Sequence, residues 1–474
     1  MSGREREGTP PAPDAGPAIL PGLLVEGAGA IATLAGGLRR GSAQGDASVI
    51  SDRGLHVGPG AATVSGAATV PGGTVAGGFS VAAWGDRLIA VGPSDDVARQ
   101  IVAAGHSLAD FARIDAAGGL VTPGLIDAHT HLVFAGTREV EWQMRSRGAG
   151  YLEILAAGGG ILSTVAATRA ATMEELAAAA RQRLAEMLAN GTTTAEAKSG
   201  YGLDTATELR QLAVIGRMDA EGPIQLVPTF LGAHAVAPEF RGRPDATAAY
   251  VASVIDEQLP AVAGQGIARF CDVFCESGVF DPAQTARVLA AARGYGLALR
   301  VHADELLPSG GAELAAALGC VSADHLAAPS DEGVAALSRA AEERHAVVAT
   351  LLPATSWFLG KHHFAPARRF IDAGIPVALA TDLNPGTSPT TSLPLVMSIA
   401  CLEMGLTPAE ALAAVTINAA CSLGLGGEIG SIELGKQADL VIWSVKSIDQ
   451  VPYWLGGRRV RSVVKRGRQV FDAD

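Results

Sequence analysis

Cysteine and aromatic side chains are scarce in this sequence. Five of the 474 residues are Cys, and Phe, Trp and Tyr together make up 5%. The cysteines are odd in number and scattered through apolar stretches, which argues against a disulfide framework and favours reduced, buried thiols. Cys271 and Cys275 are not followed by a second pair, so we interpret them as buried strand residues and not as a zinc site. With hydrophobic residues at 48%, a chain of this length can instead be stabilised by a large packed core.

Basic residues and long apolar runs are also in short supply. The chain has 36 Lys and Arg against 48 Asp and Glu, which gives a formal net charge of −12. This acidity argues against binding to nucleic acid or to an anionic membrane, but leaves room for a local basic pocket for a small anion. No segment has the pattern of a membrane span, and the N-terminal residues lack the apolar stretch of a signal peptide. We therefore expect a cytoplasmic protein that acts on a small molecule, with neither nucleic acid nor membrane as a partner.

Composition divides the chain into four parts. Residues 1–16 are rich in Pro, Gly and charge and predict a disordered tail. Residues 17–118 predict the first part of a small β domain, with a loose Gly- and Ala-rich loop at 41–78. Residues 119–424 alternate between strand and helix patterns, and residues 425–474 return to strand patterns. We expect the two outer segments to form one small β-sandwich-like domain beside the central one.

The central part contains apolar runs of strand length with helical patterns between most of them. The clearest helix spans Met173–Asn190, with Thr172 as N-cap and Glu175 in the capping-box position. This alternation predicts an α/β fold, a (β/α)8 TIM barrel; a doubly wound sheet is the alternative, but no Gly-x-Gly-x-x-Gly follows a strand. The eight predicted strands are Gly119–Ala128, Thr192–Ala197, Ile224–Leu231, Phe270–Phe274, Ala298–Val301, Val321–Ala323, Val347–Leu352 and Val377–Ala380.

The first of these strands closes with two histidines, His129 and His131, one residue apart. Residues i and i+2 of a strand point to the same face, so the two imidazoles project together, as in half of a metal site. The alternative is a pair of histidines held by hydrogen bonds at a strand end. Because the active sites of barrel enzymes lie at the C-terminal strand ends, the residues after the other strands bear on this choice.

Those strand ends carry many polar side chains. Five of the ten histidines follow predicted strands, which chance placement would not produce. Three imidazoles and a carboxylate make a suitable ligand set for zinc or iron. We predict one Zn2+ or Fe2+/Fe3+ ion per subunit, with the ligands His129, His131, His302 and Asp382. The other polar residues at these ends are Glu196, Lys198, His234, Glu276, Asp304, Glu305, His325 and Asn384.

Three of these strand-end residues have predicted catalytic roles, and Lys198 has an alternative role as a bridge between two ions. Asp382 can hold the water that such an ion activates and can take its proton. His325 is predicted to orient that water or to polarise a carbonyl, with a hydrogen-bonding role as the alternative. Glu305 is predicted to act as a proton shuttle, with a helix-capping carboxylate as the alternative. Lys198 would bridge two ions if it were carbamylated, but its position after the second strand favours a single ion.

Arg138 lies on the first loop above the histidines. Its guanidinium can bind a substrate carboxylate through two hydrogen bonds or form a surface salt bridge, and spacing alone leaves both interpretations open. Tyr201 can add a hydroxyl to the same anion. The glycines at 158–160 are too few and wrongly placed for a phosphate loop, and we interpret them as a segment that closes over the pocket.

Longer motifs surround these residues, and they resemble the imidazolonepropionase family of the amidohydrolase superfamily. The resemblance runs from about Val121 to Val464 and departs from the family pattern in the N-terminal tail and at 41–78. The motifs are Pro123-Gly-Leu-Ile-Asp-Ala-His-Thr-His131, His131-Leu-Val-Phe-Ala-Gly-Thr-Arg138, Glu196-Ala-Lys-Ser-Gly-Tyr-Gly-Leu-Asp204, Thr229-Phe-Leu-Gly-Ala-His-Ala235, Asp272-Val-Phe-Cys-Glu276, His302-Ala-Asp-Glu305, Ser322-Ala-Asp-His-Leu326 and Ala380-Thr-Asp-Leu-Asn-Pro-Gly386.

The resemblance implies a metal-dependent hydrolase of histidine breakdown, which opens the ring of 4-imidazolone-5-propanoate to give N-formimidoyl-L-glutamate. It implies the same four metal ligands, places His325 near the reacting carbonyl and implies a homodimer. By resemblance, the substrate and product pocket is lined by Arg138, Tyr201, His234, Glu305, Asn384, Gly386 and Thr387.

Two other functions stay open. A deaminase of a cyclic amidine would share the His302-x-x-Glu305 arrangement, but a neutral nucleobase has no use for Arg138. A non-catalytic scaffold relative would usually lose metal ligands, whereas all four candidates are present in this chain.

Overall fold

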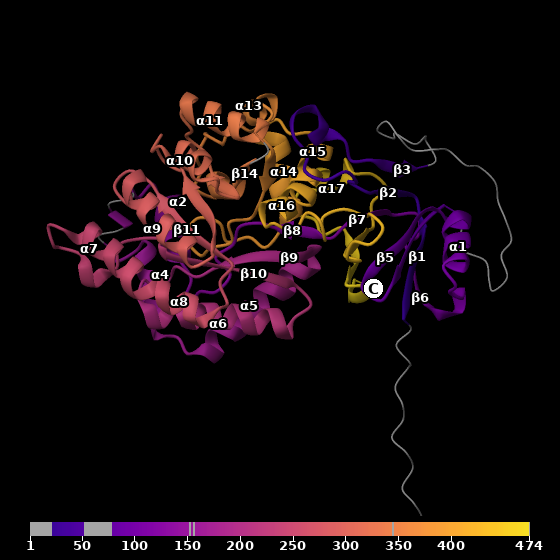
Figure 1. Ribbon diagram of the computed structural model, residues 1–474, viewed down its shortest axis with the longest axis horizontal. Coiled ribbons are helices and arrows are strands. Elements are labelled where there is room, and N and C mark those ends of the chain that lie inside the picture. The colour runs from indigo at the N-terminus through magenta and orange to yellow at the C-terminus, as the bar shows by residue number, and fades with distance from the viewer. Residues whose placement is uncertain (1–20, 52–77, 151–152, 155–156, 344–345, 474) are drawn as a thin grey trace, which may run out of the picture.

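The structure is a computed structural model that describes residues 21–51, 78–150, 153–154, 157–343 and 346–473. A barrel surrounded by helices occupies one side of the molecule, and a smaller body of strands with one helix, α1 (Ser94–Ala103), occupies the other (Figure 1). The predicted tail at 1–16 lies outside the described residues. Among the residues that are described, no helix combines the length and the apolarity of a membrane span.

Parallel strands form the barrel in the order of the sequence. The last strand returns to the first through a bridge between Thr130 and Leu383, where His131 N donates to Leu383 O at 2.9 Å. The predicted (β/α)8 barrel is confirmed. Its eight strands are β8 (Leu125–Asp127), β9 (Thr192–Lys198), β10 (Gln225–Ala233), β11 (Phe270–Cys275), β12 (Ala298–Ala303), β13 (Ser322–His325), β14 (Val348–Leu351) and β15 (Val377–Leu379).

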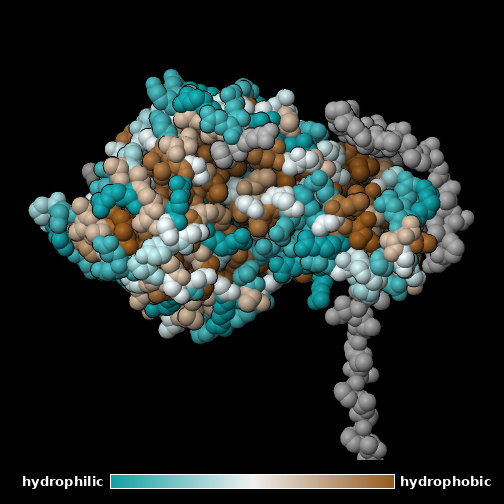
Figure 2. Space-filling view, in the orientation of Figure 1, coloured by the Kyte–Doolittle hydropathy of each residue, from teal (hydrophilic) through white to brown (hydrophobic). Residues whose placement is uncertain are grey.

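Helices cover the outside of the barrel. They are α2 (Glu139–Ser146), α4 (Ile161–Ala170), α5 (Met173–Ala189), α6 (Thr205–Glu221), α7 (Ala246–Ser253), the π-helical turn η4 (Val254–Gln258), α8 (Leu259–Gln265), α9 (Pro282–Gly294), α10 (Gly311–Leu318), α11 (Asp331–Glu342), α12 (Pro353–Phe358), α13 (Ala367–Asp372), α14 (Leu393–Glu403), α15 (Pro408–Ala414) and α16 (Ile417–Ser422). The predicted capping box of α5 is present, since Thr172 and Glu175 each accept a backbone N–H of the other. Hydrophilic side chains cover the top of the view, over α11 and α13 (Figure 2).

The predicted strand Gly119–Ala128 is two strands in the structure. Its first half, β7 (Leu120–Pro123), belongs to a sheet of the small domain, and only its second half, β8, enters the barrel. The last residue of β7 is proline, which has no N–H to donate, and Gly124 N then donates to Asp439 O of the small domain at 2.9 Å. A Cβ on Gly124 would lie 2.2 Å from Thr193 Oγ1, so the close crossing between the two sheets requires glycine.

The small domain consists of two sheets built from both ends of the described chain. One has the order β5 (Arg87–Pro93), β4 (Phe79–Trp84), β1 (Gly22–Ala28), β6 (Phe111–Asp115). The other has the order β18 (Arg468–Asp472), β17 (Val460–Lys465), β16 (Leu440–Trp443), β7, β2 (Ala30–Ala32), β3 (Val49–Ser51). Val25 and Val81 of the first sheet share one hydrophobic cluster with Val121 and Ile442 of the second. The β-sandwich-like arrangement is confirmed, while the division of the chain at 118/119 and 424/425 stays a prediction.

The described part of the predicted loop 41–78 is packed against the barrel. It contains η1 (Gly41–Gly45) and β3, which pairs with β2. Gln44 is buried; its Oε1 accepts from Val377 N at 3.1 Å and its Nε2 donates to Val377 O at 3.2 Å. These bonds satisfy the backbone at the start of β15. Residues 52–77 of the predicted loop lie outside the described residues.

Candidate active site

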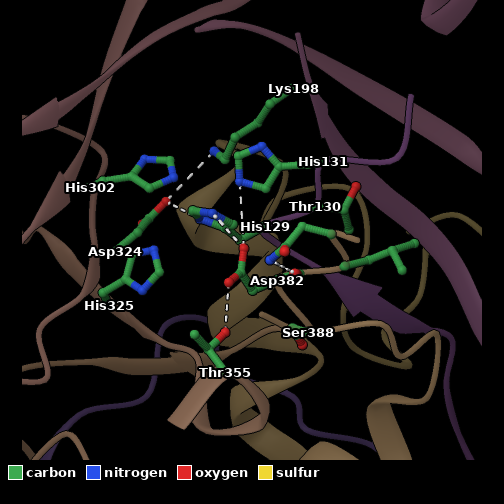
Figure 3. Close-up of polar contacts among 12 residues, drawn as sticks. His129, Thr130, His131, Lys198, His302, Asp324, His325, Thr355, Asp382 and Ser388 are labelled. Carbon is green, nitrogen blue, oxygen red and sulfur yellow. Dashed lines mark hydrogen bonds and ion pairs between the residues drawn. The ribbon is translucent and has the colours of Figure 1, made fainter. Parts of the chain in front are cut away.

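The predicted metal ligands lie together at the C-terminal ends of the barrel strands. His129 and His131 follow β8, His302 lies in β12 and Asp382 follows β15. Each of the three histidines offers one ring nitrogen, and these three nitrogens lie within 4.8 Å of one another. Asp382 Oδ1 is 3.6 Å from His129 Nε2 and 3.5 Å from His131 Nε2 (Figure 3). All four side chains are buried, and we refer to them as the histidine cluster.

The spacing in the histidine cluster suits a metal ion. His129 Nε2 and His302 Nε2 are buried without a hydrogen-bond partner among the described residues, which is costly unless a ligand fills the space between them. The two separations from Asp382 Oδ1 are long for hydrogen bonds. They match the roughly 3.3–3.6 Å between neighbouring ligands of a tetrahedral ion whose bonds are about 2.0–2.2 Å. Imidazole and carboxylate are also the donors that zinc and iron accept.

Two buried carboxylates behind the cluster orient its rings. Asp324 Oδ2 is 2.7 Å from His129 Nδ1, and Asp272 Oδ2 is 2.9 Å from His302 Nδ1. These contacts favour a proton on Nδ1 and leave Nε2 of each ring facing the centre of the cluster. The sequence patterns assigned no role to either carboxylate. For Asp272 the available signal was an acidic residue inside the apolar run of β11; the sequence of β13 around Asp324 offers no such signal.

Burial lowers the pKa values of His129 and His131 well below their usual value and lowers the pKa of the neighbouring His325 to about 4. Neutral imidazoles have a free lone pair, which is the form that binds a metal. Burial opposes the charge of His302 as well, but the Asp272 carboxylate outweighs it and raises the pKa of His302. Burial also raises the pKa of Asp382 to about 7. This carboxyl group is therefore able to exchange a proton near neutral pH.

His325 and Asp382 are held in left-handed backbone conformations, with φ of 74° and 53°. Such conformations are strained for residues other than glycine and persist where the surrounding structure enforces them, often at active sites. Asp382 N donates to His129 O at 3.0 Å, and Thr355 Oγ1 donates to Asp382 Oδ2 at 2.6 Å (Figure 3). The second carboxylate oxygen, Oδ1, is thereby aimed at the histidines. The sequence patterns did not reveal Thr355, which belongs to α12.

A cavity of about 610 Å3 opens above the histidine cluster, a size that suits a small molecule. Two of the predicted site residues do not line it. His129 lies beneath it, and Gly386 packs against the Arg138 guanidinium, where a Cβ would come within 1.9 Å of Nη1. The predicted residues that line it are His131, Arg138, Tyr201, His234, His302, Glu305, His325, Asp382, Asn384 and Thr387.

Arg138 lines the cavity with its guanidinium already paired. Nε and Nη2 donate to the two carboxylate oxygens of Glu141 at 2.8 and 2.7 Å. Glu141 also accepts from Gly160 N at 2.9 Å and lies 4.0 Å from Arg145 Nη2, which donates to Gly386 O at 2.9 Å. Arg138, Glu141 and Arg145 form what we call the anion wall; two cations around one carboxylate leave it with a net positive charge. Arg138 thus forms an ion pair at the cavity wall and not on the outer surface, and its role toward a substrate stays a prediction.

One loop after β9 positions both Tyr201 and His234. It folds around the buried carboxylate of Glu208, which accepts three of its backbone N–H groups at 2.8–2.9 Å. Gly200 O of this loop is 2.9 Å from His234 Nδ1. The His234 ring in turn stacks on His131, with centroids 4.9 Å apart and planes 15° apart. Glu208 is a further residue that supports the site and that the sequence patterns did not single out.

Glu305 lies on the loop after β12, with Oε2 3.6 Å from His325 Nε2. Its neighbour Asp304 accepts three backbone N–H groups at 2.8–3.1 Å, two of them from the first turn of α10. Glu276 fixes the other side of the loop by accepting from Leu306 N at 2.8 Å. Asp304, and not Glu305, therefore caps the next helix, α10, and Glu305 faces the cavity.

Asn384 uses its side chain to hold the loop after β15. Its Oδ1 accepts from Gly386 N at 2.9 Å and from Thr387 N at 2.8 Å, and its Nδ2 donates to Asp382 O at 2.7 Å. The predicted pocket residues on this loop thus depend on one another for their positions.

Lys198 is fully buried below the cluster. Its Nζ donates to Glu196 Oε1 and to Asp272 Oδ2, both at 2.8 Å. Burial opposes its charge, but Asp272 and Glu196 outweigh it and raise the pKa of the ammonium group. A paired ammonium is not nucleophilic, so this environment disfavours carbamylation; a single ion per site stays a prediction.

Known proteins resemble this chain over most of its length. The family model described as Amidohydrolase family matches residues 138–471. An imidazolonepropionase from Geobacillus kaustophilus (strain HTA426) is 52% identical over 385 residues, which are 81% of this chain and 88% of that protein. An imidazolonepropionase from Symbiobacterium thermophilum is 47% identical over 451 residues, which are 95% of this chain and 97% of that protein.

More distant solved structures share the architecture. An adenosine deaminase from Xanthomonas campestris with bound Zn has a TM-score of 0.63 at 20% identity, covering 94% of this chain and 92% of that one. Escherichia coli guanine deaminase has a TM-score of 0.64 at 15% identity, covering 96% and 99%. At such identities the likeness shows the fold alone. The curated relatives are far more similar, and by their identity and coverage this chain belongs to the imidazolonepropionase family of amidohydrolases.

Proposed function

We propose that the protein hydrolyses the ring of 4-imidazolone-5-propanoate to N-formimidoyl-L-glutamate, a step of histidine degradation. One observation carries this proposal: three members of the histidine cluster, His131, His302 and Asp382, line the same cavity as Arg138. A cyclic amide with a propanoate tail requires a centre that activates water for the ring and a cation for the tail. Membership of the imidazolonepropionase family supports the same reaction.

We assign one ion of zinc or iron to the histidine cluster. When bound, such an ion supplies Lewis acidity and lowers the pKa of water. Asp272 and Asp324 keep two of the rings oriented toward it. His325 also has a ring nitrogen within 4.8 Å of ligand atoms of His129 and Asp382, but we assign it to the substrate because its Nε2 faces Glu305 at the cavity. The proposed ligands are His129, His131, His302 and Asp382.

The reaction adds water across the ring C–N bond. The oxygen joins the carbonyl carbon, the C–N bond breaks and the nitrogen takes a proton. Asp382 takes a proton from the attacking water. His325 interacts with the carbonyl oxygen. Glu305, whose Oε2 lies 3.6 Å from His325 Nε2, gives a proton to the leaving nitrogen and is reprotonated by the proton that Asp382 took from the water, so the protein gains no net proton.

The remaining lining residues bind and orient the substrate. Arg138 pairs with the propanoate carboxylate, and the net positive charge of the anion wall favours an anion over a neutral ring. Tyr201 supplies a hydroxyl group, and burial raises its pKa so that it stays protonated. His234, Asn384 and Thr387 complete the pocket, and Gly386 leaves space for the Arg138 guanidinium.

Turnover of the purified, metal-loaded protein tests the proposal. Addition of 4-imidazolone-5-propanoate should give a loss of its ultraviolet absorbance, with N-formimidoyl-L-glutamate identified by mass, and a chelator should stop the reaction. No turnover of the imidazolone, together with release of ammonia from a cyclic amidine, would contradict the proposal in favour of a deaminase.

We also propose that the protein acts as a homodimer in the cytoplasm. The family resemblance supports the dimer, and the acidic composition supports an aqueous compartment. Light scattering of the purified protein tests the first, and fractionation of cells tests the second.

A further inference from the structure

Five completely buried charged side chains form one connected group of ion pairs beneath the histidine cluster, and the proposed reaction brings none of them into contact with the substrate. They are three carboxylates and two cations, so the five together carry one net negative charge. Burying charge is unfavourable unless each group is paired, so a group of this size needs a reason to exist. The five residues are Glu196, Lys198, Asp272, Arg300 and Asp324.

Each carboxylate contacts a different part of the cluster. Asp324 and Asp272 contact the rings of two histidines, as described above. Glu196 Oε2 accepts from Thr130 N at 3.1 Å, and Thr130 Oγ1 donates to Glu196 O at 2.7 Å. Thr130 lies between His129 and His131 in the sequence. The three carboxylates together therefore hold the two segments that supply imidazoles, the residues after β8 and the end of β12.

Lys198 joins these carboxylates. Its Nζ is 2.8 Å from Glu196 Oε1 and 2.8 Å from Asp272 Oδ2. It is also 3.8 Å from Asp324 Oδ2 (Figure 3). An ammonium group has three N–H donors, so a single lysine can serve several acceptors. Arg300 Nη2 contacts Asp324 Oδ2 at 3.0 Å and completes the pairing. Lys198 is thus the one side chain among the described residues that approaches all three carboxylates within 4 Å.

We propose that Lys198 is a positioning residue for the metal: it holds the three carboxylates in place, orients the imidazoles through them and so sets the affinity of the site for its ion without touching it. This inference rests on the metal site of the proposed function. It differs from a carbamylated lysine that bridges two ions, because here the amine faces its carboxylate partners below the cluster. If Lys198 acts in this way, removal of its charge should change metal binding.

The zinc affinity of Lys198→Met tests the proposal. Methionine keeps the length of the side chain and removes its charge, so Glu196 and Asp272 lose their shared partner. Substitutions behind metal ligands typically weaken metal binding about 10–100-fold, and we expect a loss in that range. Competition between the zinc-loaded protein and a chelator of known affinity measures the dissociation constant without relying on activity. The visible absorption spectrum of the Co2+-loaded variant should also shift, since it reports ligand geometry.

Lys465→Met is the matched control. Lys465 is also buried and donates to Asp439 Oδ2 at 2.8 Å, but it belongs to β17 of the small domain. Its loss should lower thermal stability and leave zinc affinity and the Co2+ spectrum unchanged. If it weakens zinc binding as much as Lys198→Met does, the effect is one of general instability and the proposal is overturned.

Glu196→Gln tests the same inference if Lys198→Met fails to fold. Glu196 contacts no ligand ring, so any change in metal binding must pass through Lys198 or Thr130. We expect zinc binding to weaken about tenfold. Unchanged affinity in a folded variant overturns the proposal, even where the wild type turns over the imidazolone. A wild type that binds no zinc overturns this inference and the proposed function together, and a wild type that binds two ions and loses one in Lys198→Met overturns it in favour of a bridging lysine.

Discussion

At one end of the cavity, the histidine cluster projects from barrel strands and their first following residues; at the other, the anion wall comes from a loop and from α2. The His129 side chain is 0% exposed, and carboxylates fix two of the three rings from behind. Arg138 and Arg145 are 13% and 21% exposed. Arg138 is held by the Glu141 carboxylate, on the short helix that follows it, and Arg145 donates to Gly386 O. The first end is over-determined by contacts from several strands, whereas Arg138 at the second end depends on one carboxylate.

This difference separates chemistry from recognition. Buried charges interact strongly and resist rearrangement, because little water is present to screen them. Partly exposed ion pairs contribute about 0–1 kcal/mol and can exchange partners when a charged ligand arrives. We therefore expect substitutions in the histidine cluster to remove turnover and substitutions in the anion wall to change substrate affinity.

The largest effect should come from His302→Asn, which removes a proposed ligand. The metal is expected to supply several kcal/mol of transition-state stabilisation, so kcat should fall about a thousandfold or more. Metal content, measured by atomic emission after dialysis, should fall with it. A variant with full metal content and a normal kcat would show that the histidine cluster is not the reaction centre.

The second effect, from Arg138→Ala, should appear in KM. A charge-assisted hydrogen bond contributes about 1.5–3 kcal/mol, which corresponds to roughly a 10–150-fold rise in KM for the imidazolone, with kcat changed only a few-fold. Metal content should not change. Arg147→Ala is the control, since Arg147 is exposed at the opposite end of α2 and its loss removes the same charge. An unchanged KM in Arg138→Ala would exclude Arg138 from binding the carboxylate.

A smaller rise in KM is expected for Glu141→Gln. Glutamine keeps the shape of the side chain but weakens both bonds to Arg138, so the guanidinium should lose its fixed direction and KM should rise about fivefold, as for loss of roughly 1 kcal/mol. Glu139→Gln is the control, because Glu139 is exposed in the same turn of α2. A fall in KM would mean that Glu141 competes with the substrate for Arg138 and does not position it.

Contacts local in sequence could be predicted, whereas contacts between distant parts of the chain could not. His129 and His131 are recognisable because a period of two residues is local, and the strand pattern around them is local as well. Asp324 was not recognisable as their support, since its contact with His129 spans 195 positions and depends on the register between strands. The docking of Gln44 on Val377 spans 333 positions and is hidden for the same reason.

Local sequence patterns also did not predict the strained backbone of Asp382 or the passage of the chain from one sheet to the other at Gly124. The left-handed conformation of Asp382, which aims its carboxylate, follows from the bonds to His129 O and Thr355 and not from its own residue type. The transfer of the strand at Gly124 from one sheet to the other depends on Asp439, far along the chain. Periodicity therefore predicted the elements and their order, while the partners of each site residue required the assembled barrel.

The last effect concerns stability, and not turnover, at the cluster end. Burial lowers the pKa of His325 to about 4, against about 6.5 for an exposed histidine. Between these values the unfolded chain binds a proton that the folded protein does not, so the contribution of His325 to stability is complete above about pH 6.5 and is lost as the pH falls toward 4. A bound cation would act in the same direction by repelling the proton.

His325→Gln should remove this dependence. In chelated protein, the Tm of the wild type should fall by a few degrees more than that of the variant between about pH 6.5 and 4, since one pKa unit corresponds to about 1.4 kcal/mol. Parallel melting curves across that range would mean that His325 takes up a proton in the folded state. The histidine-cluster end of the cavity would then be less rigid than its contacts imply. It would differ from the anion wall only in how strongly it resists rearrangement.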